Sequence, residues 1–263
     1  MKKDKKSKKK KILIIIQARM SSTRLPGKIL KTVLGKPLLY FLIERLKLVE
    51  NSNKLILAIA KGDINQPLID FAEKYDIKYK IGEEDDVLDR YYQTAKLFNG
   101  DVIVRITADC PLMDPDLIDK GLDIFLSENY DYISNNHPET YPDGYDIEIF
   151  SFKALETAWK EAKLPSEREH VTPYLWKNPD KFKISVYKSE EDLSSFRITI
   201  DEPEDYELIS KIYTEFKYNW INIRLKDVIN YLRENPDIFK INAHLIRNEG
   251  YLKSLEEDKK LLK

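Results

Sequence analysis

Short apolar runs alternate with amphipathic segments through the first half of the chain, and this order restricts the fold more than any other feature. The runs Ile12–Ile16, Leu55–Ala60 and Val102–Thr107 predict buried strands, and Ile77–Ile81 predicts a shorter one. The segments between them predict helices, one of which opens at Pro37, where the missing amide hydrogen is harmless. This βαβα order implies a mostly parallel sheet with helices on both faces.

The second half of the chain mixes the two kinds of element. Strands are predicted at Tyr145–Phe150, Lys183–Tyr187 and Phe196–Ile200, and helices near 152–163, 168–177, 203–217 and within 224–263. We expect part of this half to form an antiparallel section of the sheet. The expected organisation is a disordered tail over residues 1–11 and a single domain over 12–263, with C-terminal helices from about 203.

The tail holds eight lysines and one aspartate over residues 2–11, so it carries +7 and the rest of the chain −8, for a net charge of −1. Such a run is usually a solvated arm. It lacks the interleaved aromatic residues of a nucleic-acid-binding segment, so we expect no nucleic-acid partner.

Cys110 is the only cysteine, which excludes an intramolecular disulfide, fits a reducing compartment and predicts a packed thiol. It also excludes a cysteine-based zinc site, and the three histidines lack regular ligand spacing. No segment approaches the roughly 18 apolar residues that cross a bilayer. We therefore expect a cytoplasmic protein that does not insert into membranes.

The first predicted strand leads into a loop with three cations within ten residues, at Arg19, Arg24 and Lys28. Such a loop at the carboxyl end of a buried strand predicts an anion site, and three fixed charges suit a triphosphate. It is not a Walker loop, because Ser22 stands where the first glycine belongs and Ile29 follows the lysine. The alternative is a polar surface loop, in which Arg24 could brace a nearby carboxylate.

Two aspartates follow predicted strands and are candidates for a Mg²⁺ site. Asp109 comes after Val102–Thr107, and Asp201 comes after Phe196–Ile200. Mg²⁺ is often held by one or two carboxylates together with substrate phosphates. Either aspartate could instead cap a helix, although Asp114, before a proline, suits that role better than Asp109. For Asp201 the residues alone leave both interpretations open.

Other polar residues have local patterns with two interpretations. Asp89 and Arg90 lie early in a helix, where their spacing is typical of a solvated face, whereas Arg105 and Thr107 share one face of a strand. The buried charge of Arg105 needs a partner, which could be a substrate anion, Asp131 or a backbone carbonyl. Asp146 and Glu148 share one face and could bind sugar hydroxyls or simply face water. Arg168 and His170 lie at the start of a predicted helix, where such a pattern usually belongs to the surface.

Several motifs occur together in one order from Lys11 to about Tyr213: Gln17-Ala-Arg-Met-Ser-Ser-Thr-Arg-Leu-Pro-Gly-Lys28, Arg105-Ile-Thr-Ala-Asp-Cys-Pro111, Tyr141-Pro-Asp-Gly-Tyr-Asp-Ile-Glu148, Glu167-Arg-Glu-His-Val-Thr-Pro-Tyr174 and Ile200-Asp-Glu-Pro-Glu-Asp205. In these motifs the chain resembles cytidylyltransferases that activate sugars for bacterial surface polysaccharides. The similarity is greatest to the spore-coat polysaccharide type, and enzymes that make CMP-Kdo and CMP-sialic acid are more distant.

This resemblance implies a Rossmann-like, glycosyltransferase-A-type sheet and a Mg²⁺-dependent transfer of CMP from CTP to a sugar, which could be an acidic sugar. It implies catalytic roles for Arg19, Lys28 and Asp109, and metal binding by Asp109 and Asp201. The nucleotide contacts it implies are Gln17, Ala18, Arg19, Ser22, Arg24, Lys28, Asp89, Arg90 and Thr107. The acceptor contacts are Arg105, Asp146, Glu148, Arg168 and His170.

Two other functions remain possible on the residues alone. A glycosyltransferase could use the same kind of sheet, but the chain lacks a clear Asp-x-Asp after a strand. A non-catalytic binding module is disfavoured because the charged residues of the site are intact. Which sugar is used is undetermined, because the chain departs from the sialic-acid and Kdo enzymes around Cys110 and Glu169. Homodimers are common among such enzymes, so a homodimer is a further expectation.

Overall fold

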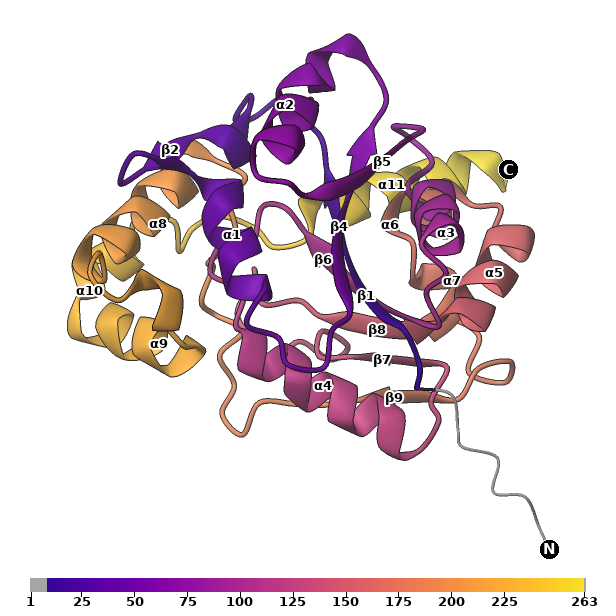
Figure 1. Ribbon diagram of the computed structural model, residues 1–263. Helices are drawn as coiled ribbons and strands as arrows, with labels where there is room; N and C mark the ends of the chain where they lie inside the picture. Colours follow the sequence, from indigo (N-terminus) through magenta and orange to yellow (C-terminus); the bar gives the residue numbers. More distant parts are fainter. Residues whose placement is uncertain (1–8, 263) are drawn as a thin grey trace, which may run out of the picture.

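A seven-stranded sheet forms the centre of the molecule in a computed structural model, which describes residues 9–262 (Figure 1). The strand order is β5 (Lys78–Gly82), β4 (Lys54–Ala60), β1 (Ile12–Ala18), β6 (Val102–Thr107), β8 (Glu148–Ser151), β7 (Tyr132–Ser134) and β9 (Ile184–Val186). The first four are parallel, whereas β8 is antiparallel to both neighbours and β7 pairs parallel with β9. The expected mostly parallel sheet with an antiparallel section is confirmed. Residues 1–8 of the predicted tail lie outside the described residues.

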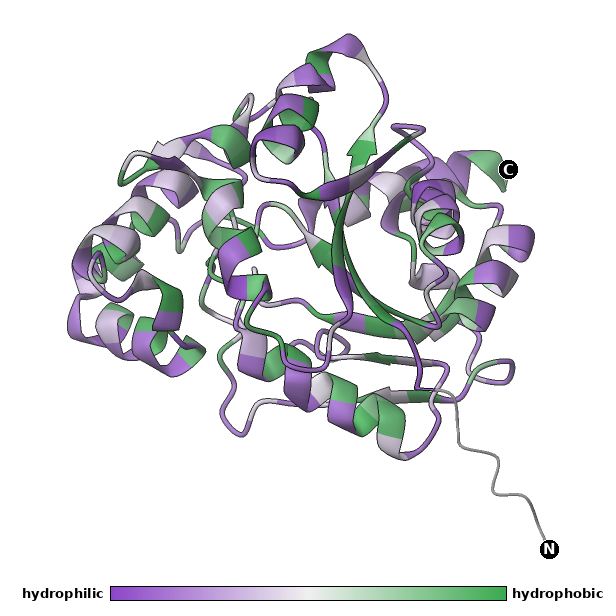
Figure 2. Cartoon of the chain, viewed as in Figure 1, coloured by the Kyte–Doolittle hydropathy of each residue, from purple (hydrophilic) through white to green (hydrophobic). Residues whose placement is uncertain are grey.

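Alternating side chains of β1 separate two apolar cores, one on each face of the sheet, as expected from period two. Ile12, Ile14 and Ile16 pack in a core with α1 (Leu38–Leu46), α2 (Gln66–Lys74), α4 (Pro115–Ser127), α8 (Pro203–Glu215) and α9 (Leu225–Glu234). Leu13 and Ile15 pack in the other with α3 (Val87–Leu97), α5 (Phe152–Glu161) and α7 (Pro173–Trp176). The apolar character of the central strands is visible in Figure 2.

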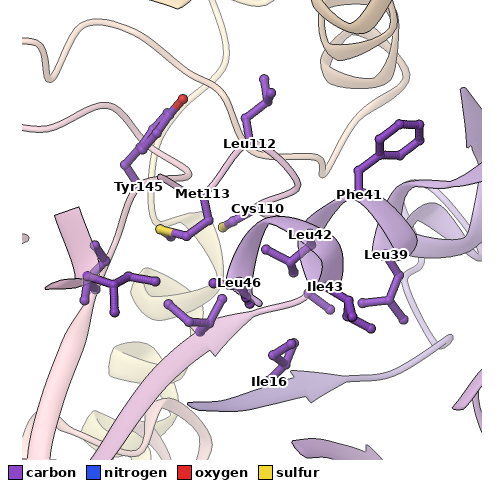
Figure 3. Close-up of a cluster of buried hydrophobic side chains, with 14 of the residues drawn as sticks. Ile16, Leu39, Phe41, Leu42, Ile43, Leu46, Cys110, Leu112, Met113 and Tyr145 are labelled. Carbon is purple, nitrogen blue, oxygen red and sulfur yellow. The ribbon is translucent and has the colours of Figure 1, made fainter. Parts of the chain in front are cut away.

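The larger core contains Cys110, as Figure 3 shows. Burial raises the pKa of its thiol well above the ordinary value, so the thiol stays protonated. The structure therefore agrees with a packed cysteine rather than a nucleophile.

Helices α4, α3 and α1 begin next to residues of types that favour the start of a helix. Asp114 accepts a hydrogen bond from the Asp116 amide at 3.0 Å and caps α4, which leaves Asp109 free of that role. Asp86 caps α3 by accepting from the Asp89 amide at 2.9 Å. Pro37 precedes α1.

Three local predictions need correction. Phe196–Ile200 is not a strand, because it forms only an isolated bridge with the loop at Asp143 and then turns to another loop, where Ile200 N donates to Asp109 O at 3.0 Å. The helix predicted at 168–177 is two short helices, α6 (Pro165–His170) and α7, because Pro173 lacks an amide hydrogen and starts a new helix. The strand predicted from Tyr145 begins only at Glu148.

The C-terminal part of the chain returns to the carboxyl ends of the strands. After α10 (Pro236–Phe239), helix α11 (Glu249–Leu261) packs against α6 (Figure 1). The remaining short elements are η1 (Lys28–Leu30), η2 (Asp63–Asn65), η3 (Trp220–Asn222) and the hairpin β2 (Thr32–Val33) and β3 (Lys36–Pro37). None of the helices within residues 9–262 is long and apolar enough to cross a membrane.

Candidate active site

A cleft of about 580 Å³ opens at the carboxyl ends of β1 and β6. Ligands of open α/β sheets bind at this place, because loops from neighbouring strands meet there. The cleft is lined by most of the predicted site residues, namely Gln17, Ala18, Arg19, Ser22, Arg24, Lys28, Arg90, Arg105, Thr107, Asp109, Asp146, Glu148, His170 and Asp201.

The cationic loop after β1 places Lys28 at the floor of the cleft. Gly27 turns the chain with a left-handed φ of 66°, a conformation that favours glycine, and η1 starts at the next residue. The Lys28 ammonium lies 2.6 Å from Asp109 Oδ2 and 2.7 Å from Asp201 Oδ1. The two predicted metal ligands therefore share one cation, and they lie on the same side of the sheet as the basic loop.

Backbone pairing holds the two aspartates together although they are far apart in sequence. The carbonyl of Asp109 accepts hydrogen bonds from Ile200 N at 3.0 Å and from Thr199 Oγ1 at 3.3 Å. Asp201 follows this segment directly. The loop after β6 thus sets the position of the second aspartate as well as the first.

The electrostatics of Asp109 favour its charged form. Burial alone would raise its pKa, but the Lys28 ammonium and hydrogen bonds from Lys28 and Thr107 outweigh burial and lower the pKa to about 2. Burial would lower the pKa of Lys28, but the two aspartates raise it. The Asp109 carboxylate and the Lys28 ammonium at the floor of the cleft are therefore both charged at neutral pH.

The other two cations of the loop differ in their surroundings. Arg24 pairs with three carboxylates, Asp201 at 3.1 Å, Glu202 at 3.0 Å and Glu249 at 2.9 Å, so it braces acidic side chains as the alternative interpretation proposed. Arg19 is exposed at the end of β1 and has no ion pair within residues 9–262. It is the loop cation most available to an anionic ligand.

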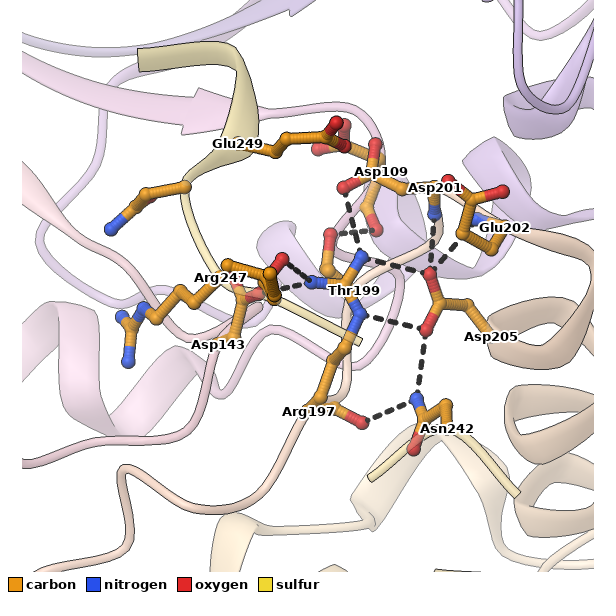
Figure 4. A network of polar contacts seen from close by, with 12 residues as sticks. Asp109, Asp143, Arg197, Thr199, Asp201, Glu202, Asp205, Asn242, Arg247 and Glu249 are labelled. Atoms are coloured by element: carbon orange, nitrogen blue, oxygen red, sulfur yellow. Dashed lines mark hydrogen bonds and ion pairs between the residues drawn. The ribbon is translucent and has the colours of Figure 1, made fainter. Parts of the chain in front are cut away.

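Arg197 is an important site residue that the sequence interpretation missed. Its guanidinium contacts Asp143 at 2.7 Å, Asp201 at 3.1 Å and Asp205 at 2.9 Å (Figure 4). It thereby holds Oδ2 of the Asp201 carboxylate, while Lys28 contacts Oδ1 of the same carboxylate. The signal that could have found it is an arginine within the apolar run Phe196–Ile200, the same signal that indicated Arg105.

The partner of Arg105 is Glu148, not Asp131 or a backbone carbonyl. The two side chains pair across the antiparallel strands β6 and β8, where Arg105 lies opposite Glu148. Burial alone would raise the pKa of Glu148, but Arg105 and the hydroxyls of Thr172 and Tyr132 keep it below its ordinary value. The pair forms one wall of the cleft with both charges balanced.

Asp89 and Arg168 do not line the cleft, so their predicted binding roles need correction. Asp89 accepts a hydrogen bond from Trp159 Nε1 at 2.8 Å, and Arg168 is paired with Asp86. These contacts join α3 to α5 and α6 behind the site. Arg90, by contrast, is buried beside the cleft, where its guanidinium donates to the carbonyl of Glu84 at 3.1 Å.

The predicted acceptor contacts lie beside the C-terminal segment, which also reaches the cationic loop through the ion pair of Glu249 with Arg24. Asp146 is paired with Arg247 at 2.5 Å. His170 Nε2 lies 3.0 Å from the Ser254 hydroxyl, which donates to Glu169 at 2.5 Å. Both contacts reach residues beyond 246, a region for which the sequence predicted helix but no role in the site.

The parallel sheet, the cationic loop and the paired aspartates together define a nucleotidyltransferase. A family model described as cytidylyltransferase matches residues 13–246, and the chain belongs to this family. The expected family and the Rossmann-like fold are thereby confirmed.

Three known proteins show how far the similarity extends. A spore coat polysaccharide biosynthesis protein of Bacillus subtilis is 30% identical over 238 residues, which are 86% of this chain and 95% of that protein. The structure of a cytidylyltransferase from Leptospira borgpetersenii is 36% identical with a TM-score of 0.83, covering 88% of this chain and 97% of that one. A CMP:2-keto-3-deoxy-manno-octonic acid synthetase in complex with CTP shares the fold, with 16% identity, a TM-score of 0.61 and coverage of 78% and 99%.

Proposed function

We propose that this chain is a Mg²⁺-dependent cytidylyltransferase that transfers CMP from CTP to a sugar hydroxyl and releases pyrophosphate, in the synthesis of surface polysaccharides. The observation that carries the proposal is Lys28 held between Asp109 and Asp201. The CTP complex of the synthetase with the same fold and the spore coat relative support the choice of nucleotide and pathway class.

The reaction forms a bond between the sugar oxygen and the α-phosphorus and breaks the bond from that phosphorus to pyrophosphate. Negative charge builds on the leaving pyrophosphate, so fixed cations lower the barrier by positioning and by electrostatic stabilisation. Arg19 and Lys28 supply these charges in the proposal. Gln17 Oε1 is buried without a hydrogen-bond partner at the end of β1, which makes it a candidate nucleotide contact.

The residues at the floor of the cleft suit a magnesium ion. Asp109 and Asp201 already share a cation, the Lys28 ammonium, and two carboxylates are what proteins commonly give Mg²⁺ when phosphates and waters supply the other ligands. Within residues 9–262 no cluster of three or more Asp, Glu, His or Cys side chains forms a complete metal site, so the nucleotide would have to contribute ligands. A bound Mg²⁺ would neutralise charge on the phosphates.

The test is release of pyrophosphate from CTP with Mg²⁺ and acidic sugars, including 3-deoxy-manno-octulosonate and N-acetylneuraminate. Lys28→Met should lower kcat/KM by roughly a hundredfold to a thousandfold, the usual effect of losing one stabilising donor. Arg19→Ala should lower it similarly without changing the melting temperature, because Arg19 makes no ion pair in the described part of the chain.

Lys36→Met is the matched control, because Lys36 is exposed in β3 and does not line the cleft. It should leave both activity and melting temperature unchanged. The proposal fails if CTP neither binds nor supports turnover with any sugar. A melting temperature raised by a UDP- or GDP-sugar, and not by CTP, would favour the glycosyltransferase alternative instead.

A further inference from the structure

The C-terminal segment forms one wall of the cleft. Ile246, Asn248, Glu249, Gly250 and Tyr251 all line it, although the family match ends at residue 246. His170 contacts this segment through Ser254 and Tyr251, and Glu249 of the segment pairs with Arg24 of the cationic loop at 2.9 Å. The segment is therefore placed to contact whatever binds beside the nucleotide.

Polar contacts anchor this segment to the body of the domain. Arg247 donates to the carbonyl of Tyr141 at 3.0 Å and pairs with Asp146. Further along α11, Asp258 accepts from the Ser166 amide at 2.9 Å and from its hydroxyl at 2.5 Å, at the start of α6. Anchors on both sides of Tyr251 fix its ring in the wall of the cleft.

Four aromatic rings from four separate segments gather at this wall. His137 lies 4.6 Å from Trp176 between ring centroids, Tyr251 lies 6.3 Å from Trp176, and His170 lies 5.1 Å from Tyr251. All four residues line the cleft. Aromatic rings combine a flat apolar face with a polar edge, which suits the face of a sugar ring that carries only C–H groups.

Two buried polar atoms beside the aromatic rings have no hydrogen-bond partner in the described part of the chain. They are Asn136 Oδ1, an acceptor, and Arg105 Nε, a donor, and both residues line the cleft. Buried polar groups are nearly always hydrogen-bonded, so a ligand with hydroxyl groups would satisfy both. Aromatic rings next to an unpaired donor and an unpaired acceptor match the mixed apolar and polar surface of a sugar.

We infer that His137, His170, Trp176 and Tyr251 form an aromatic wall for the acceptor sugar in its pyranose form, and that Tyr251 determines how tightly the sugar binds. This inference rests on the proposed function, because it assigns the acceptor end of the same cleft. It adds a specificity residue from beyond the family match. The phosphates of the nucleotide would bind next to Arg19 and Lys28.

The kinetic test compares Tyr251→Ala, Tyr251→Phe and the control Tyr218→Ala, whose tyrosine is 91% exposed. With the faster of 3-deoxy-manno-octulosonate and N-acetylneuraminate, Tyr251→Ala should raise the KM for the sugar roughly tenfold, a typical effect of losing one aromatic contact. The KM for CTP should stay within about twofold, and Tyr251→Phe should restore the sugar KM. An unchanged KM for the sugar, or an equal rise in the KM for the sugar and the KM for CTP, overturns the inference. Pyrophosphate release by the wild type would in that case still support the proposed function.

A second test measures binding and does not depend on turnover. In saturation-transfer NMR with the sugar of the kinetic test and CTP, but without Mg²⁺, irradiating the aromatic protons should transfer saturation to the C–H protons of the sugar ring. Transfer should disappear in Trp176→Ala. Absence of transfer in the wild type overturns the inference, whether or not pyrophosphate is released.

Discussion

His170 shows how the folded surroundings change the chemistry of a single residue. Burial lowers the pKa of its imidazole to about 4, although the neighbouring Glu169 carboxylate works in the opposite direction. The ring is therefore neutral at physiological pH and forms one hydrogen bond with the Ser254 hydroxyl. A neutral ring is also the form that presents an apolar face to a sugar.

The lowered pKa predicts a pH dependence of stability. Between pH 6.5 and about 4 the unfolded chain binds a proton at His170 that the folded chain does not, so the free energy of unfolding falls as the pH falls. The full loss for this group is about 3 kcal/mol. Denaturation at several pH values should show that His170→Gln reduces the wild-type loss over this window by that amount. An identical pH dependence for the variant and the wild type would contradict the prediction.

At the scale of elements, one aspartate links two helices behind the site. Asp86 caps α3 and pairs with Arg168 from α6, and the same arginine donates to the carbonyl of Trp159 in α5 at 2.9 Å. Helix α3 begins beside the cleft, and its residues Val87 and Arg90 line the cleft. The link through Asp86 therefore fixes the position of these two side chains.

Asp86→Ala should lower the free energy of unfolding by about 1–3 kcal/mol, which combines the loss of a helix cap with the loss of a partly exposed ion pair. Asp85→Ala is the matched control, since Asp85 is exposed and is the preceding residue. Chemical denaturation of both variants measures the difference. Equal stability of the two variants would show that the cap and the pair contribute nothing.

At the scale of the whole molecule, Arg45 joins three regions of the chain. It is fully buried in α1 and has no carboxylate partner within residues 9–262. Instead it donates to backbone carbonyls in the loop after β6 and near η3, those of Leu112, Met113, Trp220, Ile221 and Ile223. The arginine therefore connects the first half of the sheet to the C-terminal helices.

Arg45→Met should lower the free energy of unfolding by roughly 3–5 kcal/mol, because it leaves several buried carbonyls unsatisfied. The same substitution at Arg233, which is exposed on α9, should change stability by less than about 1 kcal/mol. Urea titrations of the two variants test this. A small effect at Arg45 would mean that water replaces the guanidinium.

Local sequence was enough to predict the strands of the first half and the main features of the site. An apolar run of β-branched residues can bury itself only as a strand or a helix, and the short runs at Ile12–Ile16 and Val102–Thr107 favour strands. Parallel strands bring their carboxyl ends to one edge, so the loop with Lys28 and the aspartate after β6 had to lie close together. The same reasoning placed Asp201 correctly although its preceding segment is not a strand.

The tertiary structure alone decided which charges pair and what closes the site. Arg105 meets Glu148 only because β8 runs antiparallel beside β6, and Arg197 collects three carboxylates from segments up to 54 residues away. The wall formed by Tyr251 depends on the docking of α11 against α6. Periodicity along a chain reports which face of an element is buried, but not which distant segment covers it, and so these contacts were beyond the sequence by itself.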